Sequence, residues 1–160
     1  MKKIQFTATY TSLNDESELN EVDKNLLQCA KEATQTAYAP YSQFKVGSAV
    51  LLENGAIVIG SNQENAAFPV TLCGERNALF AAAAQYPGII VKKVAITVDS
   101  KLKNIEKPVP PCGSCRQVLF EYESIHQHPI QLILQGDRGE IYLIDSVRDI
   151  LPIMFDATYL

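Results

Sequence analysis

The chain has 160 residues, a length that suits one domain spanning residues 1–160 with a core of its own. Its formal net charge is −4 and its lysines and arginines are scattered, so we expect no long nucleic acid as a partner. This charge does not exclude a single nucleotide or nucleoside. No apolar run approaches the roughly 20 residues that cross a bilayer. The N-terminal residues lack a signal-peptide pattern, so we expect a cytoplasmic protein without a membrane partner, whose four cysteines stay reduced.

The first part of the chain predicts one helix and one β-hairpin. Apolar residues recur at steps of three and four over residues 17–38, which is typical of one apolar helix face. Two apolar stretches, residues 45–52 and 56–62, flank the dipeptide Asn54-Gly55, a strong signal for a hairpin turn. Residues 1–16 form an N-terminal extension to which we assign neither an element nor a role.

The second part predicts three more helices and three more strands. Residues 72–86 are rich in alanine and predict a helix with Thr71 as its N-cap. The elements that follow are a strand, a helix, a two-stranded hairpin and a short last helix, at residues 91–98, 112–123, 129–134, 140–144 and 146–152. This order predicts an α/β fold with three α-β-α layers around a mixed five-stranded sheet.

Three cysteines at predicted helix starts indicate a metal site. Cys112 and Cys115 form a C-x-x-C pair, and Cys73 begins another predicted helix. The partial positive charge at a helix N-terminus favours the thiolate, which is the form that binds metal. Three protein ligands leave one tetrahedral position for water, which distinguishes catalytic zinc from structural zinc. We therefore expect one Zn²⁺ in each subunit.

Glu75 follows Cys73 by two residues and has the chemistry of a general acid and base. Bound zinc lowers the pKa of its water, and a carboxylate on the same helical turn can take that proton without occupying a metal position. Three thiolates carry more negative charge than one Zn²⁺ neutralises. We therefore expect Arg76 and Arg116 to lie near the sulfurs and offset it.

Other interpretations of these residues remain open. Cys29 as a fourth ligand would make a structural site that only joins two helices, although Cys29 also fits the apolar face of the first helix. His126 and His128 lie in a predicted polar loop, where histidines seldom bind metal. Glu75 by itself is a common charge in a first helical turn.

Four segments, in this order, resemble the cytidine deaminase family, specifically its small three-cysteine branch, which usually forms homotetramers. They are YAPYSQFKVGSAVL, GSNQENAAFPVTLCGER, PCGSCRQVL and ILPIMF, and the resemblance runs from about Ala30 to about Phe155. Zinc deaminases as a class use a three-cysteine or histidine–cysteine site and a glutamate that is not a ligand. The resemblance implies a cytidine deaminase-like fold and the hydrolysis of cytidine and 2′-deoxycytidine to uridine and 2′-deoxyuridine, with release of ammonia, in pyrimidine salvage.

The resemblance also implies roles for single residues. Cys73, Cys112 and Cys115 match the zinc ligands of the family, and Glu75 matches the residue that shuttles protons. Asn62 and Glu64 match a motif that holds the ribose 3′-hydroxyl. The other substrate contacts that the resemblance implies are Phe44, Phe68 and the backbone of Gly74.

Gly74 and Phe155 are two further positions at which the resemblance has consequences. Gly74 stands where the family usually has alanine, so the methyl group is missing but the backbone that touches the base remains. Phe155 matches an aromatic residue that closes over the active site of a neighbouring subunit, which implies a homotetramer with shared sites.

Rival functions can be separated by experiment. One is a deaminase of another aminopyrimidine, such as a free base, a nucleotide or a nucleoside-like antibiotic. Another is a non-enzymatic structural zinc protein. A deaminase that edits RNA or DNA fits poorly with the acidic charge of this chain.

Overall fold

A computed structural model describes residues 1–160. Its centre is one six-stranded sheet with the strand order β1-β6-β5-β4-β2-β3. The pair β4 and β5 is parallel and all other neighbours are antiparallel, so the sheet is mixed. The strands are β1 (Thr11–Leu13), β2 (Phe44–Leu52), β3 (Ile57–Ser61), β4 (Val91–Ser100), β5 (Gln131–Gln135) and β6 (Ile141–Ile144).

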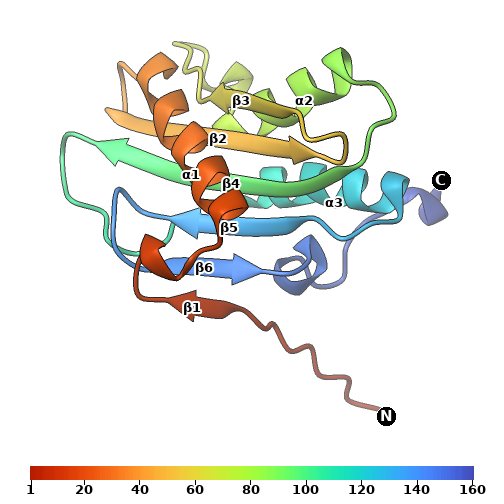
Figure 1. The fold of residues 1–160 in the computed structure, drawn as a ribbon. Helices are drawn as coiled ribbons and strands as arrows, with labels where there is room; N and C mark the ends of the chain where they lie inside the picture. Colours follow the sequence, from red (N-terminus) through yellow and green to blue (C-terminus); the bar gives the residue numbers. More distant parts are fainter.

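Helices cover both faces of this sheet. Helix α1 crosses one face, and helices α2 and α3 lie next to each other on the opposite face (Figure 1). The α-helices are α1 (Glu21–Ala33), α2 (Gly74–Gln85) and α3 (Gly113–His126). Short 3₁₀-helices are Glu16–Glu18, Thr34–Thr36, Phe68–Val70, Val147–Ile150 and Ala157–Tyr159. None of the α-helices combines the length and the apolar character needed to cross a membrane.

Each face of the sheet has its own hydrophobic core, because successive side chains of a strand point to opposite sides. In β4, Val94 and Ile96 pack with Leu79 of α2 and Phe120 of α3, whereas Ala95 between them packs under α1. Such strands, buried on both faces, are typical of a sheet between two helical layers. The predicted three-layer α-β-α fold is therefore confirmed.

The sheet has one strand more than the five predicted. β1 pairs with β6 at the edge of the sheet, with Thr11 opposite Leu143 and Leu13 opposite Ile141. It falls inside the extension to which the sequence assigns no element. β1 has only three residues, two of them polar, so its sequence shows no alternation of apolar and polar side chains. Its stabilising partner, β6, is also distant in sequence.

Several element boundaries also differ from the prediction. The first helix begins at Glu21, because the Asn20 side chain accepts a hydrogen bond from the backbone N–H of Asp23 and caps it there. Thr71 does not cap the second helix: its hydroxyl accepts a hydrogen bond from the N–H of Asn65, and Cys73 is the N-cap. The predicted last helix is only a 3₁₀-helix, Val147–Ile150.

Glycine allows α2 to approach the sheet closely. A Cβ atom on Gly60 of β3 would lie 2.3 Å from the backbone nitrogen of Ala78, which is far inside van der Waals contact. Any other residue there would push α2 outward. This matters for function because the first turn of α2 carries Cys73 and Glu75.

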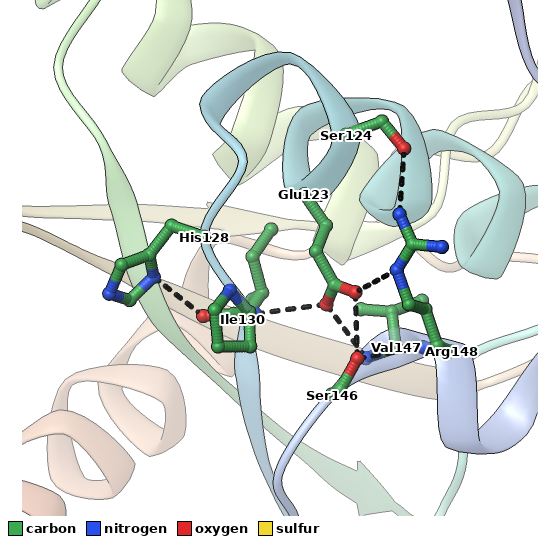
Figure 2. A network of polar contacts seen from close by, with 8 residues as sticks. Glu123, Ser124, His128, Ile130, Ser146, Val147 and Arg148 are labelled. Carbon is green, nitrogen blue, oxygen red and sulfur yellow. Dashed lines mark hydrogen bonds and ion pairs between the residues drawn. The ribbon is translucent and has the colours of Figure 1, made fainter.

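Glu123, near the end of α3, is a buried carboxylate with 3% exposure. It accepts hydrogen bonds from the backbone N–H groups of Ile130 and Val147, both at 2.9 Å, and from the Ser146 hydroxyl at 2.7 Å. The Arg148 guanidinium forms an ion pair with it at 3.2 Å (Figure 2). The network joins the end of α3 to the start of β5 and to the C-terminal segment.

We expect Glu123→Ala to lower the free energy of unfolding by about 3 kcal/mol, because it leaves two buried N–H groups without an acceptor. Glu121→Ala is the matched control, since Glu121 is exposed on the same helix. Urea titrations at one fixed protein concentration measure both variants. Equal stability of the two variants would show that the network contributes nothing.

Candidate metal centre and active site

The structure brings three thiols together where α2 and α3 begin. Cys73 is the N-cap of α2, Cys112 is the N-cap of α3, and Cys115 lies in the first turn of α3. The Sγ atoms of Cys73 and Cys112 are 3.9 Å apart, and those of Cys112 and Cys115 are 3.5 Å apart. All three Sγ atoms lie within 4.8 Å of one another, and none is in a disulfide.

This spacing fits one zinc ion. A Zn–S distance of about 2.3 Å gives a tetrahedron whose sulfurs are about 3.8 Å apart, close to the observed separations. Thiolates are soft donors and favour Zn²⁺ over Mg²⁺ or Ca²⁺. Cys29 packs against the core on the α1 side of the sheet, opposite to α2 and α3, so it does not complete a four-cysteine site.

Positive charge near the sulfurs favours thiolate. The Arg76 Nη2 atom lies 3.6 Å from the Cys73 sulfur and donates a hydrogen bond to the carbonyl of Thr71. A hydrogen bond from the Cys115 thiol, together with Arg76, lowers the pKa of Cys73 to about 5. The same contact with Cys73, together with burial, raises the pKa of Cys115. Without metal, the contact between the two thiols and the charge of Arg76 thus favour ionisation of Cys73 over that of Cys115.

Arg116 makes its hydrogen bonds to main-chain carbonyls. From the sequence we expect it near the sulfurs. Its Nε donates to the carbonyl of Pro111 at 2.8 Å, and its Nη1 donates to the carbonyl of Ile150 at 2.9 Å. Arg116 thus fixes the backbone at Pro111, the residue before Cys112, and so supports the position of that thiol through the main chain.

Glu75 is in the first turn of α2, beside the thiols, and is only 5% exposed. Burial raises the pKa of its carboxyl group, and the negative charge at Cys73 adds to this effect. A carboxyl group with a raised pKa can both accept and donate a proton near neutral pH. The fold therefore gives Glu75 the surroundings that a proton shuttle needs.

Asn62 fixes the start of β2 to the end of β3. Its Oδ1 accepts a hydrogen bond from the N–H of Val46 at 2.8 Å, and its Nδ2 donates one to the carbonyl of Phe44 at 2.9 Å. One N–H and one lone pair of the side-chain amide remain for another partner. Asn62 is thus held rigidly while it keeps hydrogen-bonding capacity.

Glu64 and Phe68 share a hollow of about 380 Å³ with Tyr41, Ser42 and Thr71. Partial burial disfavours the ionised form of Glu64, but hydrogen bonds from Ser42 and from the N–H of Tyr41 outweigh it, so the pKa of this carboxyl is lowered. The Phe68 ring is 68% exposed and meets Tyr41 edge to face at 5.8 Å. A carboxylate that is ionised and already oriented can accept a hydrogen bond from a hydroxyl group.

Phe44 faces a different hollow, of about 360 Å³, which it shares with residues 103–107 and Val109 of the loop before α3. Phe44 at the start of β2 and the preceding residues Tyr41 and Ser42 therefore line two different hollows. No site role was predicted for Tyr41, Ser42 or this loop. The segment YAPYSQF, which contains the first two, is the signal that could have identified them.

Gly74 is buried in tight packing. A Cβ atom there would lie 3.0 Å from the carbonyl oxygen of Val46 and 3.4 Å from the backbone nitrogen of Asn62. An alanine fits only if its neighbours move by a few tenths of an ångström. Glycine thus lets the first turn of α2 lie directly against β2 and β3.

The C-terminal segment is partly folded onto its own chain. Leu151 and Met154 pack against the core, and the Gln117 side chain donates a hydrogen bond to the carbonyl of Phe155 at 2.8 Å. The Phe155 ring is 58% exposed and stacks on Tyr159 with the ring centres 5.6 Å apart. The segment is therefore anchored while its aromatic rings face outward.

In zinc-stripped protein at about pH 6.5, we expect iodoacetamide to alkylate Cys73 at least about tenfold faster than Cys29. Cys73 is a thiolate above its pKa of about 5, whereas burial raises the pKa of Cys29 and keeps its thiol protonated. Mass spectrometry of peptides measures both rates. Reloading with zinc should protect Cys73 and leave the rate at Cys29 unchanged. Equal rates at Cys73 and Cys29 without zinc would contradict the assigned charge state.

Comparison with known proteins agrees with this geometry. Residues 20–130 match the family model of the cytidine and deoxycytidylate deaminase zinc-binding region. The chain is 40% identical over 132 residues to the cytidine deaminase of Halalkalibacterium halodurans, covering 82% of this chain and 92% of that one. It is 44% identical over 134 residues to that of Sporosarcina psychrophila, with 82% and 89% covered. The crystal structure of the Burkholderia pseudomallei cytidine deaminase superposes with a TM-score of 0.71 and 36% identity, covering 82% of this chain and 97% of that one. The chain belongs to the cytidine and deoxycytidylate deaminase family.

Proposed function

We propose that this protein is a zinc-dependent cytidine deaminase that converts cytidine and 2′-deoxycytidine to uridine and 2′-deoxyuridine with release of ammonia. One observation carries the proposal: three thiols with zinc spacing lie at two helix N-termini, with the buried Glu75 in the same turn. The similar proteins from H. halodurans and S. psychrophila are cytidine deaminases. The reaction belongs to pyrimidine salvage, which we place in the cytoplasm.

Glu75 carries the protons of the reaction. Cys73, Cys112 and Cys115 would hold zinc, which would act as a Lewis acid and lower the pKa of the reacting water. Glu75 takes a proton from the water that attacks C4 and gives it to N3 of the pyrimidine. It then carries the second proton of that water to the leaving amino group, so ammonia departs and the C4 carbonyl forms.

Asn62 and Glu64 hold the ribose. Asn62 offers a free N–H, and Glu64 offers an ionised carboxylate that Tyr41 and Ser42 orient. Phe44 and Phe68 supply aromatic surface for the substrate, and the Gly74 backbone faces the base. The charge of Glu64 disfavours a phosphate close to the sugar, so nucleosides are preferred over nucleotides.

A structural zinc site explains these features less well. Burying a carboxylate costs free energy, and a metal that only joins two helices gives no reason to bury Glu75 beside it. Cys29 on the far face of the sheet also leaves the site with three thiols. Arg76 and Arg116 support those thiols, the first through its charge and the second through the backbone.

The working enzyme is a homotetramer with shared active sites. Phe155, Tyr159 and Leu160 are exposed apolar side chains on one short anchored segment, and such groups usually mark a contact. In this assembly Phe155 closes over the site of a neighbouring subunit, excludes water and stacks on the base.

We expect the purified protein to convert cytidine in an ultraviolet assay and to lose this activity with a zinc chelator. Glu75→Gln should retain zinc and lose at least about 100-fold in activity, because an amide cannot shuttle protons. Glu121→Gln, on an exposed surface, is the control and should behave as wild type. Normal turnover by Glu75→Gln would exclude the assigned role.

We expect Glu64→Ala to reduce kcat/KM for cytidine by about 100-fold and to change turnover of free cytosine little, because the lost partner is a sugar hydroxyl. Parallel assays with cytidine, cytosine and deoxycytidylate measure this. Equal losses on cytidine and cytosine would mean that Glu64 supports only the fold.

We expect light scattering to give a mass near 71 kDa, four times the 17.7 kDa of one chain. Deletion of residues 155–160 should raise KM for cytidine more than it lowers the melting temperature, because the deletion removes a lid rather than a core. A monomer with normal turnover would refute the shared site and leave the zinc chemistry intact.

A further inference from the structure

The segment before β1 has the pattern of a β-strand that lacks a partner. Residues 1–10 run extended away from the sheet and contain no helix or strand (Figure 1). Their apolar and polar side chains alternate: Ile4, Phe6, Ala8 and Tyr10 are separated by Gln5, Thr7 and Thr9. Ile4 is 87% exposed, Phe6 51% and Tyr10 54%. Apolar side chains at every second residue, exposed on one face, indicate a β-strand whose pairing partner lies outside this chain.

The sheet of the same chain cannot provide this partner. In the antiparallel register of β1 with β6, Thr11 lies opposite Leu143, so Tyr10 falls opposite Ile144, the last residue of β6. Residues before Tyr10 therefore extend past the end of β6. β1 is also the edge of the sheet, so its outer side carries unpaired N–H and C=O groups.

We propose that this segment pairs antiparallel with the same segment of a second copy of this chain, about a two-fold axis through Ala8. This register places Phe6 opposite Tyr10 of the other copy and Thr7 opposite Thr9, each pair occurring twice. Cross-strand aromatic pairs and threonine pairs both stabilise antiparallel strands. Tyr10 already packs on Tyr142 at 4.5 Å, so Phe6 of the second copy lengthens an existing aromatic row.

The segment is complementary to itself in this register. A shift by one residue would place the apolar face of one copy on the polar face of the other. A shift by two would pair Phe6 with Ala8 or Ser12 and lose both aromatic pairs.

Charge adds to this complementarity. In this register Lys2 of one copy lies opposite Asn14 of the other, and the Glu18 carboxylate binds the backbone N–H and the side chain of Asn14. Acidic charge therefore lies near the N-terminal lysines. These features favour a second copy over an unrelated partner. The family match begins at residue 20, so this contact is independent of the proposed deaminase function.

Disulfide capture tests the axis directly. In the full-length zinc-loaded protein, Ala8→Cys places two thiols opposite each other, with Cβ atoms about 5 Å apart. Gln5→Cys is the control, because its two copies lie six residues apart along the paired strands, about 20 Å. Oxidised glutathione accepts the two electrons as the two thiols lose their protons and form one disulfide. Because a strand pair this short is marginal, the reaction is run at high protein concentration.

We expect non-reducing gels to show covalent dimers of Ala8→Cys at least about tenfold faster than of Gln5→Cys. Adding Phe6→Lys should reduce the Ala8→Cys rate by at least about tenfold, whereas adding Thr7→Lys on the polar face should change it little. Cytidine turnover should be the same in all variants, which shows that the domain remains folded. Equal capture rates for Ala8→Cys and Gln5→Cys, or a Phe6→Lys effect no larger than that of Thr7→Lys, would overturn the proposal.

Discussion

Three thiolates repel one another, and they can converge on one divalent cation only where positive charge offsets them. In this protein the offset comes from the N-termini of α2 and α3 and from Arg76. Both helices must therefore begin at the same place. α2 packs closely on β3 because position 60 is glycine, and α3 forms the crossover between the parallel strands β4 and β5. The zinc site is thus a consequence of how the helices meet the sheet.

The candidate substrate residues belong to the same rigid unit. Asn62 holds the start of β2 through Phe44 and Val46, and the backbone of Gln63 exchanges two hydrogen bonds with that of Leu72, the residue before Cys73. Glu64 then holds the turn at Tyr41. A short stretch of chain therefore fixes the proposed sugar contacts relative to the first zinc ligand. This kind of preorganisation limits the motion that catalysis must overcome.

Helix α3 links the metal site to the far end of the molecule. Its start holds Cys112 and Cys115, and Gln117 binds the carbonyl of Phe155. Glu123 anchors the start of the 3₁₀-helix Val147–Ile150. The exposed Phe155 is therefore attached to the same helix that supplies two thiols. A contact made by a neighbouring subunit at this segment would act on a rigid support.

Local chemistry in the sequence determined much of this protein. Hydrophobic periodicity and the Asn54-Gly55 turn predicted the helices and the central hairpin, because both depend on neighbours in the chain. The pairs Cys73 with Glu75 and Cys112 with Cys115 are also local and indicated the candidate site, whereas the fold brings the two pairs together. Tertiary structure alone decided other features. β1 forms because β6, over a hundred residues away, offers it an edge; Cys29 is separated from zinc by the sheet; and Arg116 turns to carbonyls that the fold presents. The pairing of β1 with β6 and the bond from Arg116 to Ile150 join residues distant in sequence, so no local pattern encodes them.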